Sequence, residues 1–170
     1  MPPTAAPATV SPEVPPEQVA LFDRFLSSLG NAAELPAGTT SKDSFSDLIR
    51  GFVEVDRIER GRVSCSFSVK PPIVNPYKGL HGGVVASVAE RVSTACARTV
   101  VPEDRELFLG ELSTSYLSTA PLDAEVVVVA SLVRSGRNIT VVSVEFRLKQ
   151  TGKLAYTAHA TFFNLPGSKL

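Results

Sequence analysis

From residue 75 to residue 100 the chain reads NPYKGLHGGVVASVAERVSTACARTV. The part from residue 83 onwards is rich in valine and alanine, contains no proline and is too long for a strand, so it predicts one long helix over residues 83–100. A helix with small side chains lets a sheet approach closely, and four alanines supply them: Ala86, Ala89, Ala95 and Ala97.

Six strand-like stretches surround this helix, two before it and four after it. Residues 52–58 and 62–69 predict a hairpin that turns at Arg60 and Gly61. The four later strands are predicted over residues 107–117, 125–134, 138–149 and 154–163. This order predicts an α+β protein of the hotdog type, in which a curled antiparallel sheet wraps round one long central helix. Unpaired sheet edges favour association between copies.

The ends of the chain differ from this middle part. Residues 1–16 contain six prolines among small residues and predict a flexible tail. Residues 17–43 predict an extra N-terminal helix over 17–29 and a linker, residues 44–165 the hotdog domain, and residues 166–170 a C-terminal tail. The final Ser168-Lys169-Leu170 matches the tripeptide that the peroxisomal import receptor reads, which predicts a peroxisomal location with the cytoplasm as the alternative.

Composition excludes several classes of function. Seventeen basic and seventeen acidic residues cancel, which argues against nucleic acid as a partner. The two cysteines and two histidines lack the spacing of metal ligands, so no metal site is expected. No apolar run reaches the length of about 20 residues that a membrane span requires, and no secretory signal is recognisable. These features predict a soluble intracellular protein.

The candidate site lies where polar residues meet the long helix. The His81-Gly82-Gly83 turn precedes it, where free N–H groups and the helix dipole favour an oxygen with negative charge, and Gly82 lets a ligand reach the backbone. Glu90 lies about 12 Å further along the axis and interrupts an apolar face. Thr94 follows at i+4, where its hydroxyl can bond a carboxylate or a water.

Simpler interpretations stand beside these. The glycine pair is compatible with ordinary turn chemistry, and Glu90 with a solvent-facing stripe that includes Arg91 and Arg98. Tyr116 and the pair Phe162 and Phe163 fall at strand positions, where aromatic residues usually serve the core or an interface, so no chemistry is assigned to them.

The run from Asn75 to Glu90 resembles the active-site sequence of the hotdog-fold acyl-CoA thioesterases, the family that includes acyl-CoA thioesterase 13, the phenylacetate-pathway thioesterases and 4-hydroxybenzoyl-CoA thioesterase. The resemblance covers about residues 47–163 and implies hydrolysis of an acyl-CoA thioester. It implies that Asn75 orients the substrate or water, that Gly82 beside His81 polarises the carbonyl, and that Glu90 is the base or nucleophile. Thr94 also matches an active-site position of the family.

The resemblance carries implications for assembly as well. The family's site lies between subunits, so Asn75, His81 and Gly82 of one chain should face Glu90 and Thr94 of its partner. A homodimer is then the smallest active unit, and a homotetramer is common among relatives. One departure concerns the strand after the helix, where some members carry a water-holding serine and this chain has Leu109 beside Gly110. Thr94, Ser113 or the backbone would then take that role.

Coenzyme A requires cationic contacts for its phosphates. Two guanidiniums and loop amides between two predicted strands suit this task, so the predicted substrate-binding residues are Arg134, Ser135, Gly136 and Arg137, together with Gly83. A solvated turn is the alternative. No cofactor is expected, because hydrolysis requires only water and coenzyme A is part of the substrate.

Two other classes of function remain open. A hotdog hydratase or dehydratase would carry a catalytic histidine in a characteristic motif, which this sequence lacks. A non-catalytic acyl-CoA binding module would keep the fold without a reason to keep Glu90. Only a thioesterase releases free thiol from acyl-CoA.

Overall fold

The computed structural model describes residue 11 and residues 15–28 and 42–166. The chain divides into two units, residues 1–41 and residues 42–170. The first contains helix α1 (Pro16–Ser28), which agrees with the predicted N-terminal helix. Most of the predicted Pro-rich tail and the last four residues of the C-terminal tail lie outside the described residues.

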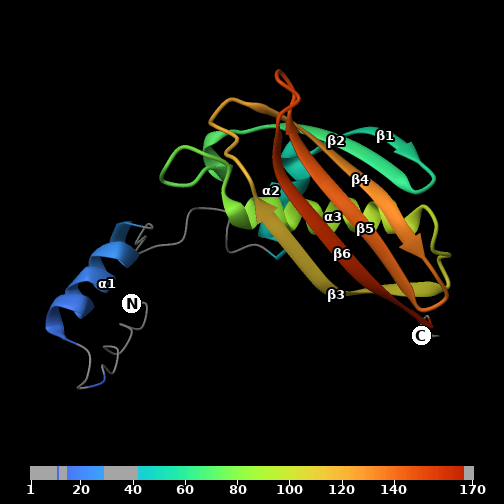
Figure 1. The fold of residues 1–170 in the computed structure, drawn as a ribbon, viewed down its shortest axis with the longest axis horizontal. Helices are drawn as coiled ribbons and strands as arrows, with labels where there is room; N and C mark the ends of the chain where they lie inside the picture. Colours follow the sequence, from blue (N-terminus) through green and yellow to red (C-terminus); the bar gives the residue numbers. More distant parts are fainter. Residues whose placement is uncertain (1–10, 12–14, 29–41, 167–170) are drawn as a thin grey trace. The chain divides into compact units, whose positions relative to one another are not determined.

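The second unit is built on one six-stranded antiparallel sheet (Figure 1). Along the sheet the strands follow the order β1-β2-β4-β5-β6-β3, so β1 and β3 form its two edges. The strand bounds confirm the predicted hairpin and the four later strands: β1 Glu54–Glu59, β2 Arg62–Ser68, β3 Arg105–Tyr116, β4 Glu125–Ser135, β5 Ile139–Leu148 and β6 Leu154–Pro166.

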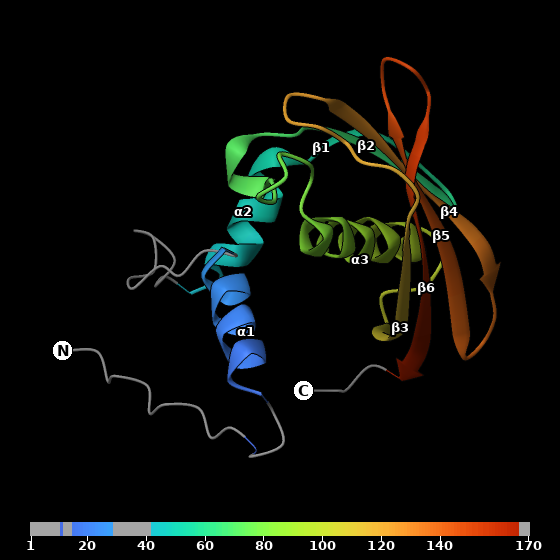
Figure 2. The same cartoon turned by 60° about the vertical axis from the view of Figure 1, so that its left-hand side comes forward.

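Helix α3 (Gly82–Arg98) lies in the concave side of this curled sheet (Figure 2). Its buried side carries Val85, Val88 and Ala89, which pack against inward-facing side chains of the strands. This arrangement confirms the predicted hotdog fold, whose core forms between one helix and one sheet. The expectation for Ala95 is corrected: its side chain is exposed, because it lies on the flank of the helix that borders β1 and not in the core against the sheet.

Strand β3 runs antiparallel to α3, and hydrogen bonds fix the two ends of this pairing. At the start of the helix, the Tyr116 hydroxyl donates to the Gly82 carbonyl at 3.0 Å. At its end, Arg98 Nη1 donates to the Arg105 carbonyl at 2.6 Å. Glu90, midway along α3, therefore lies level with the middle of β3.

A short helix, α2 (Ser44–Phe52), precedes β1 and was not predicted from the sequence. Phe52 ends this helix instead of starting a strand, and its ring packs edge-on against Phe67 with centroids 5.3 Å apart. The spacing Phe45, Leu48, Ile49 and Phe52 follows the i, i+3, i+4, i+7 pattern of a helix, which was the available signal.

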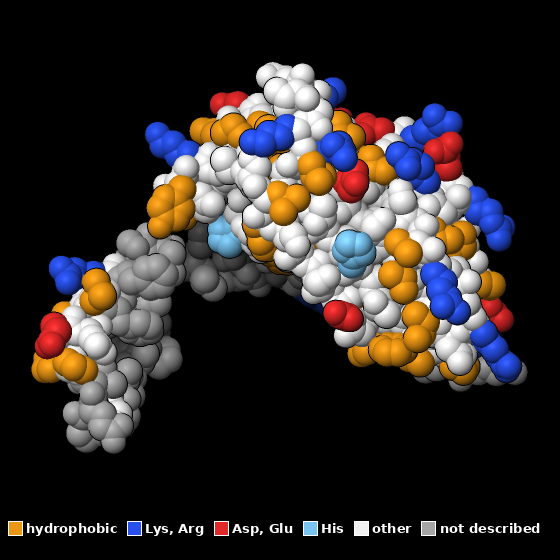
Figure 3. All heavy atoms as spheres, viewed as in Figure 1, with side chains coloured by type: hydrophobic (Ala, Val, Ile, Leu, Met, Phe, Trp, Pro, Cys, Tyr) orange, Lys and Arg blue, Asp and Glu red, His pale blue; other side chains and the backbone are white. Residues whose placement is uncertain are grey.

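The convex face of the sheet carries mixed charges (Figure 3). Acidic, basic and apolar side chains alternate across it, in keeping with a net charge of zero. Among the described residues, none of the helices combines the length and apolar character needed to cross a membrane.

Candidate functional site

The first turn of α3 has four backbone N–H groups that no helical carbonyl can accept. Three are used locally. The His81 N–H donates to the Ile73 carbonyl at 2.9 Å, the Gly83 N–H to His81 Nδ1 at 3.0 Å, and the Val84 N–H to the His81 carbonyl at 2.9 Å. Among the described residues the Gly82 N–H has no acceptor. The turn thus offers one free N–H at the positive end of the helix dipole, suited to an oxygen with negative charge.

His81 is the N-cap of α3, with φ −65° and ψ 130°. Because Nδ1 accepts a hydrogen bond, the neutral ring carries its proton on Nε2. The His81 N–H donates to the Ile73 carbonyl at 2.9 Å, which ties the cap to the preceding loop. The sequence predicted His81 as a site residue. In the structure its Nδ1 and its backbone hold the turn through hydrogen bonds. The residue is exposed, so Nε2 is left for a ligand.

Asn75 organises the loop that leads into the cap. Its Oδ1 accepts from the Tyr77 N–H at 3.0 Å and from the Gly79 N–H at 3.1 Å. Gly79 leaves room for the Thr119 hydroxyl, which a Cβ at this position would displace. Among the described residues, Asn75 Nδ2 has no acceptor. If Asn75 orients substrate or water, as predicted, it does so through this amide nitrogen.

Glu90 lies on the exposed face of α3, and the prediction that it interrupts an apolar buried face is wrong for the single chain. The buried position is its neighbour Ala89, one helical step of about 100° away. Within the described part of the chain, the Glu90 carboxylate has no hydrogen-bond or ion-pair partner. The Thr94 hydroxyl donates to the Glu90 backbone carbonyl at 2.7 Å, not to the carboxylate as expected.

The two flanks of this exposed face meet different elements. One flank, with Arg91 and Ala95, lines an apolar groove of about 230 Å³ together with Val55 and Ile58 of β1. Because β1 and β3 are opposite edges of the sheet, the other flank faces β3. Glu90 belongs to that second flank, about 140° round the helix from Ala95. The carboxylate therefore lies toward the free edge of β3.

The middle of β3 offers no hydroxyl to Glu90. A bulge separates Leu109 from Glu111, and the Phe163 ring covers Gly110 within it, so a Cβ at this position would displace that ring. Ser113 pairs with the exposed His159, whereas its neighbour Leu112 faces the other side of the sheet and pairs with buried Ala160. Ser113 thus points to the convex face, which removes it as the water-holding residue of its own chain.

Two polar residues at the end of β3 were missed by sequence reasoning. Thr114 and Tyr116 share the inward face with Leu112, and the Thr114 hydroxyl donates to Tyr116 Oη at 3.3 Å. Tyr116 bonds the Gly82 carbonyl, and its ring lies 3.3 Å from where a Cβ on Gly82 would stand. It is no core residue, since 54% of it is exposed. The bulge at Gly110 shifts the alternation of β3 by one residue, so the inward direction of these two side chains could not be read from the sequence alone.

The predicted phosphate-binding turn lies at the opposite end of α3. Ser135, Gly136 and Arg137 share a pocket of about 320 Å³ with Val100 and Val101, which follow the helix. The helix is about 25 Å long, so within one chain this turn is remote from Gly82.

Several polar groups of this turn are already used in hydrogen bonds with residues of the same hairpin. The Gly136 N–H donates to the Ile139 carbonyl at 2.8 Å, so the expected free amide at Gly136 is wrong. The Ser135 hydroxyl lies 3.2 Å from the Thr140 hydroxyl. The exposed guanidiniums of Arg134 and Arg137 have no ion-pair partner among the residues described, and these remain the groups suited to phosphate.

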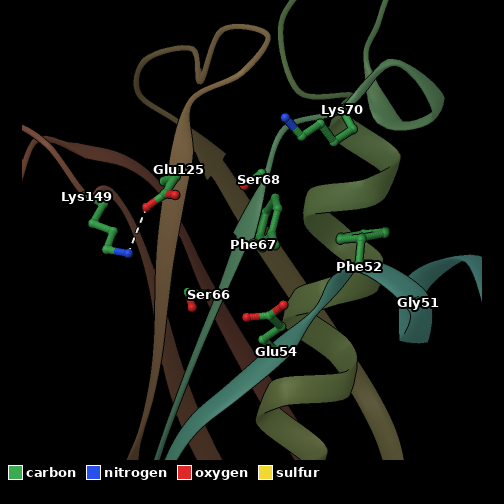
Figure 4. A pocket seen from close by; sticks show the side chains of 9 residues that line it. All are labelled: Gly51, Phe52, Glu54, Ser66, Phe67, Ser68, Lys70, Glu125 and Lys149. Atoms are coloured by element: carbon green, nitrogen blue, oxygen red, sulfur yellow. Dashed lines mark ion pairs between the residues drawn. The ribbon is translucent and has the colours of Figure 1, made fainter.

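A polar pocket of about 310 Å³ lies between the end of α2 and β2 (Figure 4). Both of its lysines are paired: Lys149 Nζ lies 2.7 Å from Glu125 Oε2, and Lys70 Nζ lies 3.1 Å from Asp123 Oδ1. The hydrogen bond with Lys149 lowers the pKa of Glu125. Both lysines are thus already paired and Glu54 adds a further carboxylate to the lining, which makes this pocket a poor phosphate site.

Cysteine chemistry is also disfavoured. Burial raises the pKa of the Cys65 thiol to about 11, with the charge of Asp56 adding to the effect, and burial likewise raises that of Cys96. Both thiols therefore stay protonated at neutral pH and are poor nucleophiles. The described residues contain no cluster of three or more potential metal ligands.

Comparison with known proteins agrees with this geometry. The thioesterase superfamily profile matches residues 77–155, which include the α3 turn and Glu90. Human acyl-coenzyme A thioesterase 13 is 25% identical over 131 residues, covering 68% of this chain and 91% of the human protein. The chain is therefore similar to the thioesterase superfamily over residues 77–155 and shares the hotdog fold of these proteins.

Solved structures of hotdog thioesterases and their relatives share the fold. AziG of S. sahachiroi superposes with a TM-score of 0.66 at 25% identity, covering 72% of this chain and 96% of AziG. A hypothetical thioesterase of Streptococcus pneumoniae, solved with coenzyme A, gives a TM-score of 0.64 at 21% identity, covering 74% of this chain and 96% of that one.

Proposed function

We propose that this hotdog-fold protein is a thioesterase that hydrolyses an acyl-CoA thioester to the free acid and coenzyme A. The observation that carries the proposal is the Gly82 N–H, the single unpaired donor of the first turn of α3. Hydrolysis passes through a tetrahedral intermediate whose carbonyl oxygen gains negative charge. One backbone donor aimed at that oxygen is worth about 3 kcal/mol of barrier.

Glu90 supplies the second requirement, an activated oxygen. As a general base it would take a proton from water, which then attacks the thioester carbon. As a nucleophile its carboxylate would displace the thiolate of coenzyme A and form a mixed anhydride, which water cleaves. Both routes need a carboxylate without a fixed partner, and the Glu90 side chain meets that requirement in the described part of the chain.

One chain alone cannot complete this site. Gly82 and Glu90 are about 12 Å apart along α3, too far to act on the same carbonyl. A two-fold axis crossing the helix near Ala86, midway between them, would set Gly82 of one chain opposite Glu90 of its partner. Gly83 and Ser87 on the exposed face leave room for a second helix, and the free edge of β3 can pair with its copy.

The same arrangement accounts for the remote arginines. The end of α3, with the turn that carries Arg134 and Arg137, would lie about 12 Å beyond the partner's catalytic turn. Coenzyme A separates its thioester from its phosphates by the long pantetheine arm. We therefore assign the phosphates to this turn, across the dimer interface from the Gly82 that polarises the carbonyl.

Mixing inactive variants tests the shared site. Co-expression of Gly82→Pro and Glu90→Gln chains should yield heterodimers with one intact site, so activity should recover to about a quarter of the parent value when the chains pair at random. Each variant expressed alone supplies the control. If the mixture stays as inactive as the separate variants, each site is built from a single chain and the dimer model is wrong.

Release of free thiol from acyl-CoA tests the activity itself. We expect thiol release from at least one member of a panel of aliphatic and aromatic acyl-CoAs, with the panel also identifying the acyl group. A hotdog hydratase would change an enoyl or hydroxyacyl substrate without releasing thiol, and a binding module would leave every substrate intact.

We also propose peroxisomal import through Ser168-Lys169-Leu170, which lies outside the described residues. A fluorescent protein fused to the N-terminus of the 170-residue chain should appear in peroxisomes, and deletion of Leu170 should leave it in the cytosol. The measurement is co-localisation with a peroxisomal marker. A cytosolic signal from the intact fusion would contradict the proposal.

A further inference from the structure

Tyr116 is the last residue of β3, and its side chain reaches the turn at the start of α3. Its hydroxyl donates to the Gly82 carbonyl at 3.0 Å and accepts from the Thr114 hydroxyl at 3.3 Å. The bonded carbonyl belongs to the same residue as the free N–H. A side-chain hydrogen-bond chain from β3 thus ends at the residue that offers the donor.

The turn requires such a restraint because two adjacent glycines have more backbone freedom than any other pair. The other polar groups around Gly82 are already held: the His81 N–H by the Ile73 carbonyl and the Gly83 N–H by His81 Nδ1. These bonds tie the turn to the loop and to itself. The Tyr116 hydroxyl ties it to β3, which pairs with β6 from Arg105 to Tyr116.

The Tyr116 ring is itself fixed from beneath. It packs edge-on against Tyr156 with centroids 5.9 Å apart, and Tyr156 packs in the same way against buried Phe146. Tyr156 is buried, and its Oη accepts from the Ala120 N–H at 2.8 Å. The Tyr116 ring is therefore half exposed at the site, and its contact with Tyr156 holds it against the core.

We propose that Tyr116 is a positioning residue that orients Gly82 so that its N–H meets the thioester carbonyl. This inference rests on the proposed thioesterase function. An unrestrained glycine turn would sample orientations in which the N–H misses the developing oxyanion, and small misplacements of a catalytic group have large effects on rate.

Tyr116→Phe tests the proposal by removing the hydroxyl while keeping the ring and its packing. We expect kcat for thiol release to fall about tenfold because the donor is oriented for a smaller fraction of the time. KM should stay within about threefold and the melting temperature within about 2 °C, since the lost bond is half exposed. An unchanged kcat would overturn the proposal, as would a fall fully explained by a higher KM.

Tyr156→Phe is the matched control, because it removes the other hydroxyl of the same aromatic pair. It leaves the buried Ala120 N–H without its acceptor, so the melting temperature should fall while kcat stays within about threefold of the parent. If Tyr156→Phe lowers kcat as much as Tyr116→Phe does, the effect of Tyr116 is general loosening and not positioning.

Hydrogen exchange gives a readout that does not depend on activity. In Tyr116→Phe the hydrogen-bonded amides of residues 83–85 should exchange at least about fivefold faster than in the parent, with the rest of α3 unchanged. Exchange that stays at the parent rate would overturn the proposal even if kcat fell. If the parent released no thiol from any acyl-CoA, the proposed function would fail, while this measurement would still decide whether Tyr116 restrains the turn.

Discussion

Glu90→Gln should lower kcat for acyl-CoA hydrolysis by at least about a hundredfold, because glutamine keeps the volume and polarity of the side chain but is neither a base nor a nucleophile. Substrate binding should persist. Glu90 is exposed in the single chain, and its carboxylate has no partner among the described residues, so its loss should leave folding unchanged. Steady-state thiol release and the melting temperature measure the two effects.

The control for this substitution is Glu145→Gln. Glu145 is exposed on β5 and its Oε2 lies 3.0 Å from Arg147 Nη2, an exposed pair of the kind that contributes about 0 to 1 kcal/mol. This variant should retain the parent kcat. If Glu90→Gln instead keeps kcat within about threefold, with the same oligomeric state and melting temperature, Glu90 is an ordinary solvent-facing residue and the mechanism is wrong.

Gly82→Pro should lower kcat by about a hundred- to a thousandfold, since proline has no N–H to offer the oxyanion. The helix should survive, because Gly82 is its first residue, where proline is favoured. His81 before it has φ −65° and ψ 130°, the extended conformation that a residue preceding proline adopts. Circular dichroism and size-exclusion chromatography should therefore match those of the parent.

Gly82→Ala separates loss of the N–H from added bulk. Alanine introduces a Cβ about where proline does, in contact with the Tyr116 ring at 3.3 Å, but it keeps the N–H. We expect Gly82→Ala to retain at least about ten times the kcat of Gly82→Pro. Equal activities of the two variants would show that crowding, and not the missing donor, limits the reaction, and would remove Gly82 as the polarising group.

Much of the fold follows from local sequence periodicity. Residues 83–100 predict the helix observed as Gly82–Arg98, and the alternating stretches predict all six strands. These signals are short-range, because a face of a helix or strand recurs every few residues. Helix α2 was not predicted although its apolar spacing was present, because Phe52 also suited the start of a strand.

The sequence alone determined the helix, the turn before it and the spacing of Gly82, Glu90 and Thr94 along it, because positions on one helix depend only on residue number. Only the tertiary structure decided which N–H of the turn is free, since that depends on where the His81 side chain and carbonyl point.

The contacts between distant segments belong to the tertiary structure too. The bulge at Gly110 shifts the alternation of β3 by one residue, so Ser113 points to the convex face. The pairing of β3 with β6 brings Tyr116 to Gly82, 34 residues earlier in the chain. The position of β3 at the sheet edge opposite β1 decides that Glu90 lies on the flank of α3 beside β3. Such placements arise from strand order and chain packing, which no local pattern encodes.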